Sequence, residues 1–317
     1  MTQSWLRAFR RLLQGMLSWV EALQKRSPRK EGRSFFSREV HIPTPLVTAG
    51  AAAVLFFILL PEVGLTPRHL ICLLGFLGFL VAFFVIYFRY DLPQFTNDDE
   101  AVFLTGVCIL LGVLFIEVGR VIPSFSEFAV PVGSIAIVVT LLLQIRLALL
   151  INIVLALIAG FLNRFSYDIT VVCFFSGAAA MLACQKVRTR GDILSVGFHV
   201  AWVTLLTMWG LRIFHAGSPN LRLIDAGWAL LNGALTASLP LALLPMLESF
   251  FSRITAITLL EVGDFNRPLL RRLMIEAPGT YHHTLLVSAL AEQAAEAIGA
   301  NSLLCRVGMY YHDIGKL

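Results

Sequence analysis

The sequence predicts an all-α fold: a polytopic bundle of about eight membrane-spanning helices, followed by a short helical segment in the cytoplasm. The first observation is composition, because 57% of the residues are hydrophobic and 14% are charged, against about 25% charged in soluble domains. The second is that the charged residues are absent from eight long windows, and crossing a bilayer takes about 20 apolar residues as a helix. These windows are residues 40–61, 69–88, 101–116, 128–145, 147–163, 169–185, 193–211 and 226–247.

Residues 1–39 form a basic N-terminal arm on the cytoplasmic side of the membrane. Nine of the 25 Lys and Arg residues lie in it, and apolar residues from Trp5 to Leu23 recur at helical spacing between them. One interpretation is an amphipathic helix on anionic membrane lipids; the other is a solvated arm beside the membrane. A nucleic acid polymer is not expected as a partner, since basic residues next to a span already have a lipid explanation.

Residues 40–247 form the expected transmembrane bundle. The bias of basic residues toward the N-terminus places that end in the cytoplasm, and eight spans return the C-terminus to the same side. Only Gln144, Ile145 and Arg146 separate the fourth and fifth windows. An unbroken helix over 128–163 would run about 54 Å, so we expect a tight helical hairpin there.

Residues 248–317 have ordinary polar composition and form the expected cytoplasmic segment. A helix should begin at Pro268, with Asp264 or Asn266 as its cap. After a turn over 276–280, a second helix should run from about His282 to Ile298 and end at Gly299. Asn301 or Ser302 can cap a third helix that reaches His312.

This arrangement places His283 at the start of one helix and His312 with Asp313 at the end of the next. Antiparallel packing would bring the three side chains together. Imidazole and carboxylate groups are ligands for iron, manganese or zinc, and two such ions about 4 Å apart stabilise both oxygens in phosphate-ester hydrolysis. Lys316, one turn further, could contact a phosphate oxygen. From the residues alone, helix caps and surface histidines are the favoured interpretation.

The motifs Pro278-Gly279-Thr280-Tyr281-His282-His283-Thr284 and His312-Asp313-Ile314-Gly315-Lys316 resemble the bacterial seven-transmembrane HD-domain phosphohydrolases of the cyclic di-AMP phosphodiesterase type.

The resemblance implies that residues 248–317 are a linker and the first helices of a cytoplasmic HD domain. It implies metal ligands at His283, His312 and Asp313, and catalytic roles for His312, Asp313 and Lys316. The implied cofactors are two manganese or iron ions. The implied substrate is a cyclic dinucleotide, and the implied location is the bacterial inner membrane.

Two departures from the family lead to further expectations. Only residues 62–68 separate the first two windows, so the extracytoplasmic sensor domain of the family is expected to be lacking. The family also completes its site with residues downstream of this motif, so we expect a truncated HD domain, little activity in the 317-residue chain alone, and no partners for Leu286, Leu290 and Val307. The alternatives are an inactive membrane regulatory or scaffold protein and, more remotely, a transporter. The sequence leaves the oligomeric state open.

Overall fold

The computed structural model describes residues 52–53, 56, 67–90, 98–122, 125–185, 187–216, 223–251 and 253–317. Every regular element in these ranges is helical, and none of them contains a strand. The basic arm lies outside the described residues, and so does almost all of the first window. The amphipathic helix and the first span therefore stay predictions.

Seven apolar helices coincide with the second to eighth predicted windows, which confirms an all-α membrane bundle. Five of them are long and apolar enough to cross a membrane by themselves, while α3 and α6 contribute shorter apolar stretches. The count of about eight spans is therefore not confirmed. The helices are α3 (Pro67–Tyr90), α5 (Asp99–Val121), α6 (Val132–Leu142), α7 (Ile145–Leu162), α8 (Tyr167–Cys184), α9 (Arg190–Ala216) and α10 (Leu223–Phe251).

The expected break between the fourth and fifth windows is present. Helix α6 ends at Leu142 and α7 begins at Ile145, with non-helical backbone at Leu143 and Gln144. With 11 residues, α6 is only about 16 Å long at 1.5 Å per residue. It packs against α5, α7, α8 and α10 and is buried along nearly its whole length. A helix that is apolar on all sides is suited to this central position.

Several polar side chains inside the bundle are paired with neighbouring backbone or side chains. The Asn232 amide of α10 donates to the carbonyl oxygens of Phe128 and Val130, at 2.8 and 3.1 Å, in the segment of η2 (Glu127–Ala129) that leads into α6. Glu117 and Arg120 form an ion pair one turn apart, with an N–O distance of 3.1 Å. Such pairing lowers the cost of placing polar groups among apolar helices.

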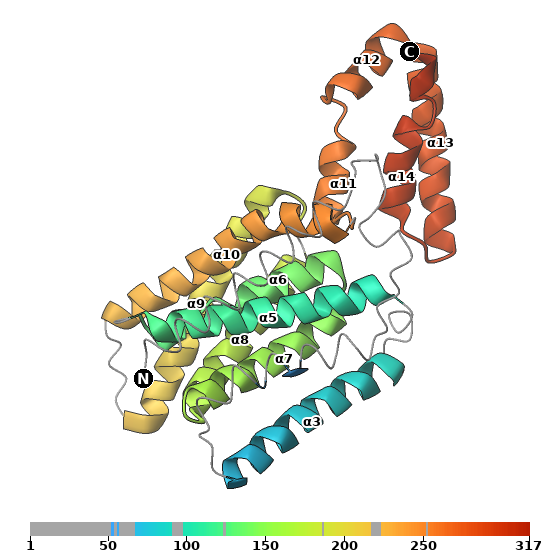
Figure 1. The fold of residues 1–317 in the computed structure, drawn as a ribbon. Helices are drawn as coiled ribbons and strands as arrows, with labels where there is room; N and C mark the ends of the chain where they lie inside the picture. Colours follow the sequence, from blue (N-terminus) through green and yellow to red (C-terminus); the bar gives the residue numbers. More distant parts are fainter. Residues whose placement is uncertain are drawn as a thin grey trace.

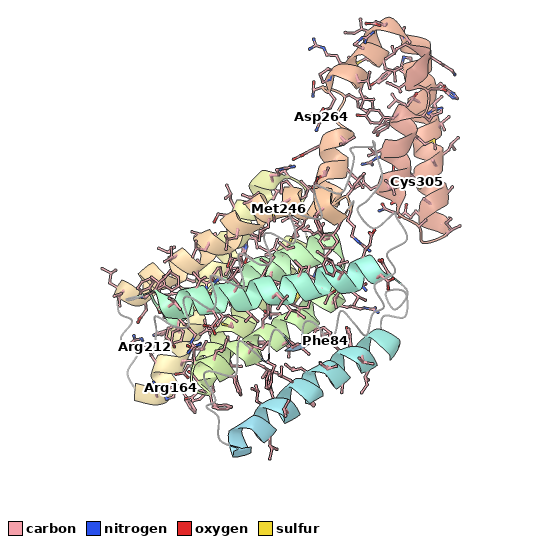
Figure 2. The ribbon with its side chains drawn as sticks, in the orientation of Figure 1. Phe84, Arg164, Arg212, Met246, Asp264 and Cys305 are labelled. Carbon is pink, nitrogen blue, oxygen red and sulfur yellow. The ribbon has the colours of Figure 1, made fainter. Side chains whose placement is uncertain are left out.

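Figure 1 shows α5–α10 side by side, with α3 at the edge of the bundle. The C-terminal segment projects from the end of α10 and consists of α11 (Ala256–Val262), α12 (Pro268–Glu276), α13 (Pro278–Ala297), α14 (Ser302–Tyr311) and the 3-10 helix η3 (Ile314–Lys316). Figure 2 places Asp264 and Cys305 in this segment, with Arg164 and Arg212 toward the opposite end of the bundle.

Several local predictions for this segment are confirmed and others are wrong. The Asn301 side chain caps α14 by accepting from the Leu304 N–H at 3.0 Å, and Gly299, with φ of 69°, follows the end of α13. The expected caps of α12 are wrong, because Asp264 Oδ1 accepts from the Asn266 N–H at 2.9 Å in a turn before the helix.

The predicted turn over 276–280 is too long, and the predicted start of α13 at His282 is too late. Helix α13 begins at Pro278, because a proline at the first helical position costs no hydrogen bond. Leu286 and Leu290 are exposed, as expected, at 69% and 67%. Val307 is buried instead, because α11 packs against α14 and covers it.

Candidate metal centre

Antiparallel packing of α13 and α14 brings His283, His312 and Asp313 together. One ligand atom from each lies within 4.8 Å of the others, and this is the one group of three or more possible metal ligands in the described part of the chain. Asp313 Oδ2 lies 3.5 Å from His312 Nε2 and 3.9 Å from His283 Nε2. The arrangement expected from the sequence is therefore present.

The end of α14 determines how His312 and Asp313 are presented. Helix α14 ends at Tyr311, and η3 then turns the chain, with the Lys316 N–H donating to the Asp313 carbonyl oxygen at 3.0 Å. His312 Nδ1 lies 2.7 Å from the carbonyl oxygen of Met309. Since a carbonyl can only accept, Nδ1 donates this hydrogen bond, and Nε2 lies 3.5 Å from Asp313 Oδ2. Orientation by a backbone carbonyl is typical of metal-binding histidines.

Asp313 is held in its charged form. Lys316 Nζ lies 2.6 Å from Asp313 Oδ2, and this hydrogen bond lowers the pKa of Asp313, with further lowering by the charges of Lys316, His312 and His283. Lys316 itself is 62% exposed. The structure thus places the Lys316 ammonium group against the Asp313 carboxylate, on the solvent-exposed side of the site.

Contacts that the sequence analysis missed hold this corner in place. The Tyr311 hydroxyl donates to the Val262 carbonyl oxygen of α11 at 2.7 Å. The Phe265 ring packs between the rings of Tyr281 and Tyr310, with centroids 5.4 and 4.8 Å away. In the sequence, Tyr310 and Tyr311 directly before the His-Asp pair could have indicated these contacts.

Thr284 and Ser288 of α13 are buried, and they were also missed. Their hydroxyls donate to carbonyl oxygens of the same helix, Thr280 at 2.8 Å and Leu285 at 2.8 Å. Small side chains without free donors allow a neighbouring helix to approach closely. Their spacing of four residues places both on one face of α13, and this spacing could have predicted that the face is packed against another helix.

The three donors lie within 4.8 Å of one another, slightly wider than the ligands of one bound divalent cation. Ligand atoms about 2.1 Å from one ion lie roughly 3 to 3.5 Å from each other, and the two distances to Asp313 Oδ2 are 3.5 and 3.9 Å. His283 is exposed, and its ring centroid lies 5.5 Å from that of His312. The set of two imidazoles and one charged carboxylate is suited to iron, manganese or zinc.

Comparison with known proteins divides the chain into the same two parts, the helix bundle and the C-terminal segment. A family described as 7TM receptor with intracellular HD hydrolase matches residues 68–255, which is more than half of the chain. The chain belongs to this family. A second family, described as HD domain, matches residues 280–317 of this 7TM-HD chain, and this range contains every residue of the candidate centre.

Two curated relatives are cyclic-di-AMP phosphodiesterases named PgpH. The Bacillus subtilis protein is 32% identical over 258 residues, covering 77% of this chain and 36% of the relative. The Listeria monocytogenes protein is 32% identical over 256 residues, covering 76% and 35%. An uncharacterised Synechocystis protein is 35% identical over 170 residues, covering 50% and 21%. The 7TM-HD chain thus spans about a third of the length of its PgpH relatives. No solved structure matches it.

Proposed function

We propose that this multi-pass membrane protein is a metal-dependent phosphohydrolase that cleaves a phosphodiester bond of cyclic di-AMP. The observation that carries the proposal is the convergence of His283, His312 and Asp313 within the segment that matches the HD domain. The substrate follows the names of the two PgpH relatives. The membrane is the bacterial inner membrane, and both termini lie in the cytoplasm.

The proposed domains have separate roles. Residues 1–39 contact membrane lipids, residues 40–247 anchor the chain, and residues 248–317 carry the chemistry. Substrate would then reach the metal centre from the cytoplasm, where the projecting segment α11–α14 lies beyond the end of the bundle (Figure 1).

Each residue of the centre has a proposed task. His283, His312 and Asp313 hold a manganese or iron ion, which when bound supplies Lewis acidity toward a phosphate oxygen. His312 is pre-oriented by the Met309 carbonyl oxygen, so its Nε2 is already available. The long, exposed side chain of Lys316 pairs with Asp313. Its ammonium group could leave this carboxylate and bind a phosphate oxygen of the substrate instead.

Three protein donors are enough for one ion, whereas the proposed chemistry uses two. The 317 residues, assayed as they stand, are therefore expected to bind about one ion per chain and to hydrolyse cyclic di-AMP slowly. Lys316→Met should lower that turnover further and leave the ion bound, because Lys316 contributes no metal ligand.

The test uses the full chain in detergent or nanodiscs, loaded with Mn²⁺. Elemental analysis should find about one ion per chain, and both His312→Ala and Asp313→Ala should lose it. His199→Ala is the matched control, because this histidine lies on α9 and its Nδ1 bonds to the Ser195 carbonyl oxygen. Linear dinucleotide is measured by chromatography. Failure of the unmodified chain to bind Mn²⁺, iron or zinc would contradict the proposal and favour the regulatory or scaffold alternative.

A further inference from the structure

Helix α11 is the element through which the membrane bundle meets the metal centre. On the bundle side, Arg190, the first residue of α9, forms a two-pronged ion pair with Glu261. Its Nε lies 2.7 Å from Oε1, and its second guanidinium nitrogen lies 3.0 Å from Oε2. Paired bonds of this kind restrain direction as well as distance.

The start of α11 is tied to α10 as well. The Glu248 carboxylate accepts from the Thr255 N–H at 3.0 Å and from the Thr258 hydroxyl at 3.0 and 2.9 Å. Thr255 also caps α11 through its own side chain. Because α9 and α10 each hold one side of α11, a change in their relative tilt would displace it.

The other side of α11 contacts the corner that carries the metal ligands. Tyr311, the residue before His312, donates its hydroxyl to the Val262 carbonyl oxygen at 2.7 Å. Val307 packs directly over Gly263, where an added Cβ would lie 3.0 Å from Val307 Cγ2. A displacement of α11 would therefore reach the end of α14 without passing through a flexible linker.

We propose that Arg190, Glu261 and Tyr311 are positioning residues that make the placement of His312 and Asp313 depend on the packing of α9 against α10. This α11 brace, defined as these three residues with α11, couples the membrane bundle to the metal centre. The inference rests on the proposed function for the role of His312 and Asp313, but the contacts of the brace do not.

The Arg190–Glu261 pair is suited to coupling rather than to holding the fold together. The two side chains are 46% and 37% exposed, so water screens the pair, and its loss should leave the bundle folded. Because removing one charge of an exposed pair should change little, reversing the charge is the stronger test. Two like charges at this distance repel each other.

The first experiment measures amide hydrogen exchange in the full chain in nanodiscs without added metal. Arg190→Glu and Glu261→Arg should each raise exchange about 3- to 10-fold in residues 302–316, and the combined swap should restore the slow rates. Arg188→Glu is the matched control, because its side chain forms no ion pair in the described structure. Faster exchange confined to residues 256–262, or a swap that restores nothing, would overturn the proposal.

The second experiment asks whether the two ends of the brace act together. Tyr311→Phe keeps the ring and removes the donor to Val262, so exchange in residues 302–316 should rise. Adding Arg190→Glu to Tyr311→Phe should then raise it little further, whereas a fully additive increase would overturn the coupling.

Mn²⁺ affinity, followed by electron paramagnetic resonance, should fall about 3- to 10-fold in Arg190→Glu and recover in the swap. Unchanged Mn²⁺ affinity in Arg190→Glu would contradict the positioning role. If the unmodified chain binds no Mn²⁺ while the exchange results hold, the proposed function fails and the mechanical coupling stands.

Discussion

Between α9 and α10 two glycines lie so close that a methyl group would not fit, whereas α13 beside the metal centre leaves large apolar side chains exposed. A Cβ added at Gly233 would lie 2.2 Å from the Gly197 carbonyl oxygen. On α13, Leu286 and Leu290 are 69% and 67% exposed. The bundle is therefore held by close backbone packing, and the C-terminal segment by a thin core and individual polar contacts.

This difference indicates where the molecule can move. In the bundle, polar groups such as Asn232 are buried and paired, and a shift of one helix would disrupt many contacts at once. The proposed metal ligands lie in the part with the thinner core, where local opening costs less free energy. The chain thus joins a closely packed membrane bundle to a segment with a thinner core through α11.

The largest expected effect comes from breaking the closest packing in the bundle. Gly233→Ala should lower the free energy of unfolding by about 3 kcal/mol, because the new methyl group collides with the Gly197 backbone. Thermal unfolding in detergent measures this. Gly227→Ala is the control on the same helix, because a Cβ there meets nothing within 4 Å. Equal losses for the two variants would show that α9 and α10 are not closely packed.

A smaller effect is expected from opening the thin core of the C-terminal segment. Leu273 is fully buried on α12, so Leu273→Ala should cost about 2 to 3 kcal/mol, read as faster hydrogen exchange in α12 and α13. Leu286→Ala removes the same atoms from an exposed site and should cost less than about 0.5 kcal/mol. A large effect at Leu286 would mean that another surface covers it in solution.

The smallest effects are expected from ion pairs, and the loss of stability should again be larger in the bundle than in the C-terminal segment. Asp225 is buried and paired with the half-buried Arg212 of α9 at 2.7 Å, so Asp225→Asn, which weakens this charged hydrogen bond, should cost about 1 to 2 kcal/mol. The exposed Arg272–Glu276 pair of α12 should contribute little.

The hydrogen bond from Arg272 lowers the pKa of Glu276 from its usual 4.5. Any stabilisation by this pair is therefore present above pH 4.5 and is lost as the pH falls through the lowered pKa. The difference in Tm between the unmodified chain and Arg272→Ala should vanish at low pH. A difference in Tm that persists at low pH would show that Arg272 acts through packing rather than through the ion pair.

The elements that the sequence predicted well are those set by local physics. The apolar windows anticipated α3 and α5–α10, because charged groups are excluded from hydrocarbon over about 20 residues. The break before Ile145 followed from helix length, and the cap at Asn301 followed from side-chain chemistry. None of these depends on a distant part of the chain.

The errors arose where a residue's environment comes from another element. Val307 was expected to lack a partner and is covered by α11, and Asp264 was expected to cap α12 and instead closes a turn before it. The pairing of Arg190 with Glu261 joins residues 71 positions apart. No periodicity in the sequence relates such positions.

By itself, the sequence determined that this is a helical membrane chain with a His-Asp motif in its last residues, because composition and short spacing act within one helix. Only the tertiary structure decided that Lys316 bonds to the same carboxylate oxygen that His283 and His312 approach, and that α11 joins the bundle to this corner. Those contacts depend on how separate helices pack, and packing is set by complementary surfaces that are distant in sequence.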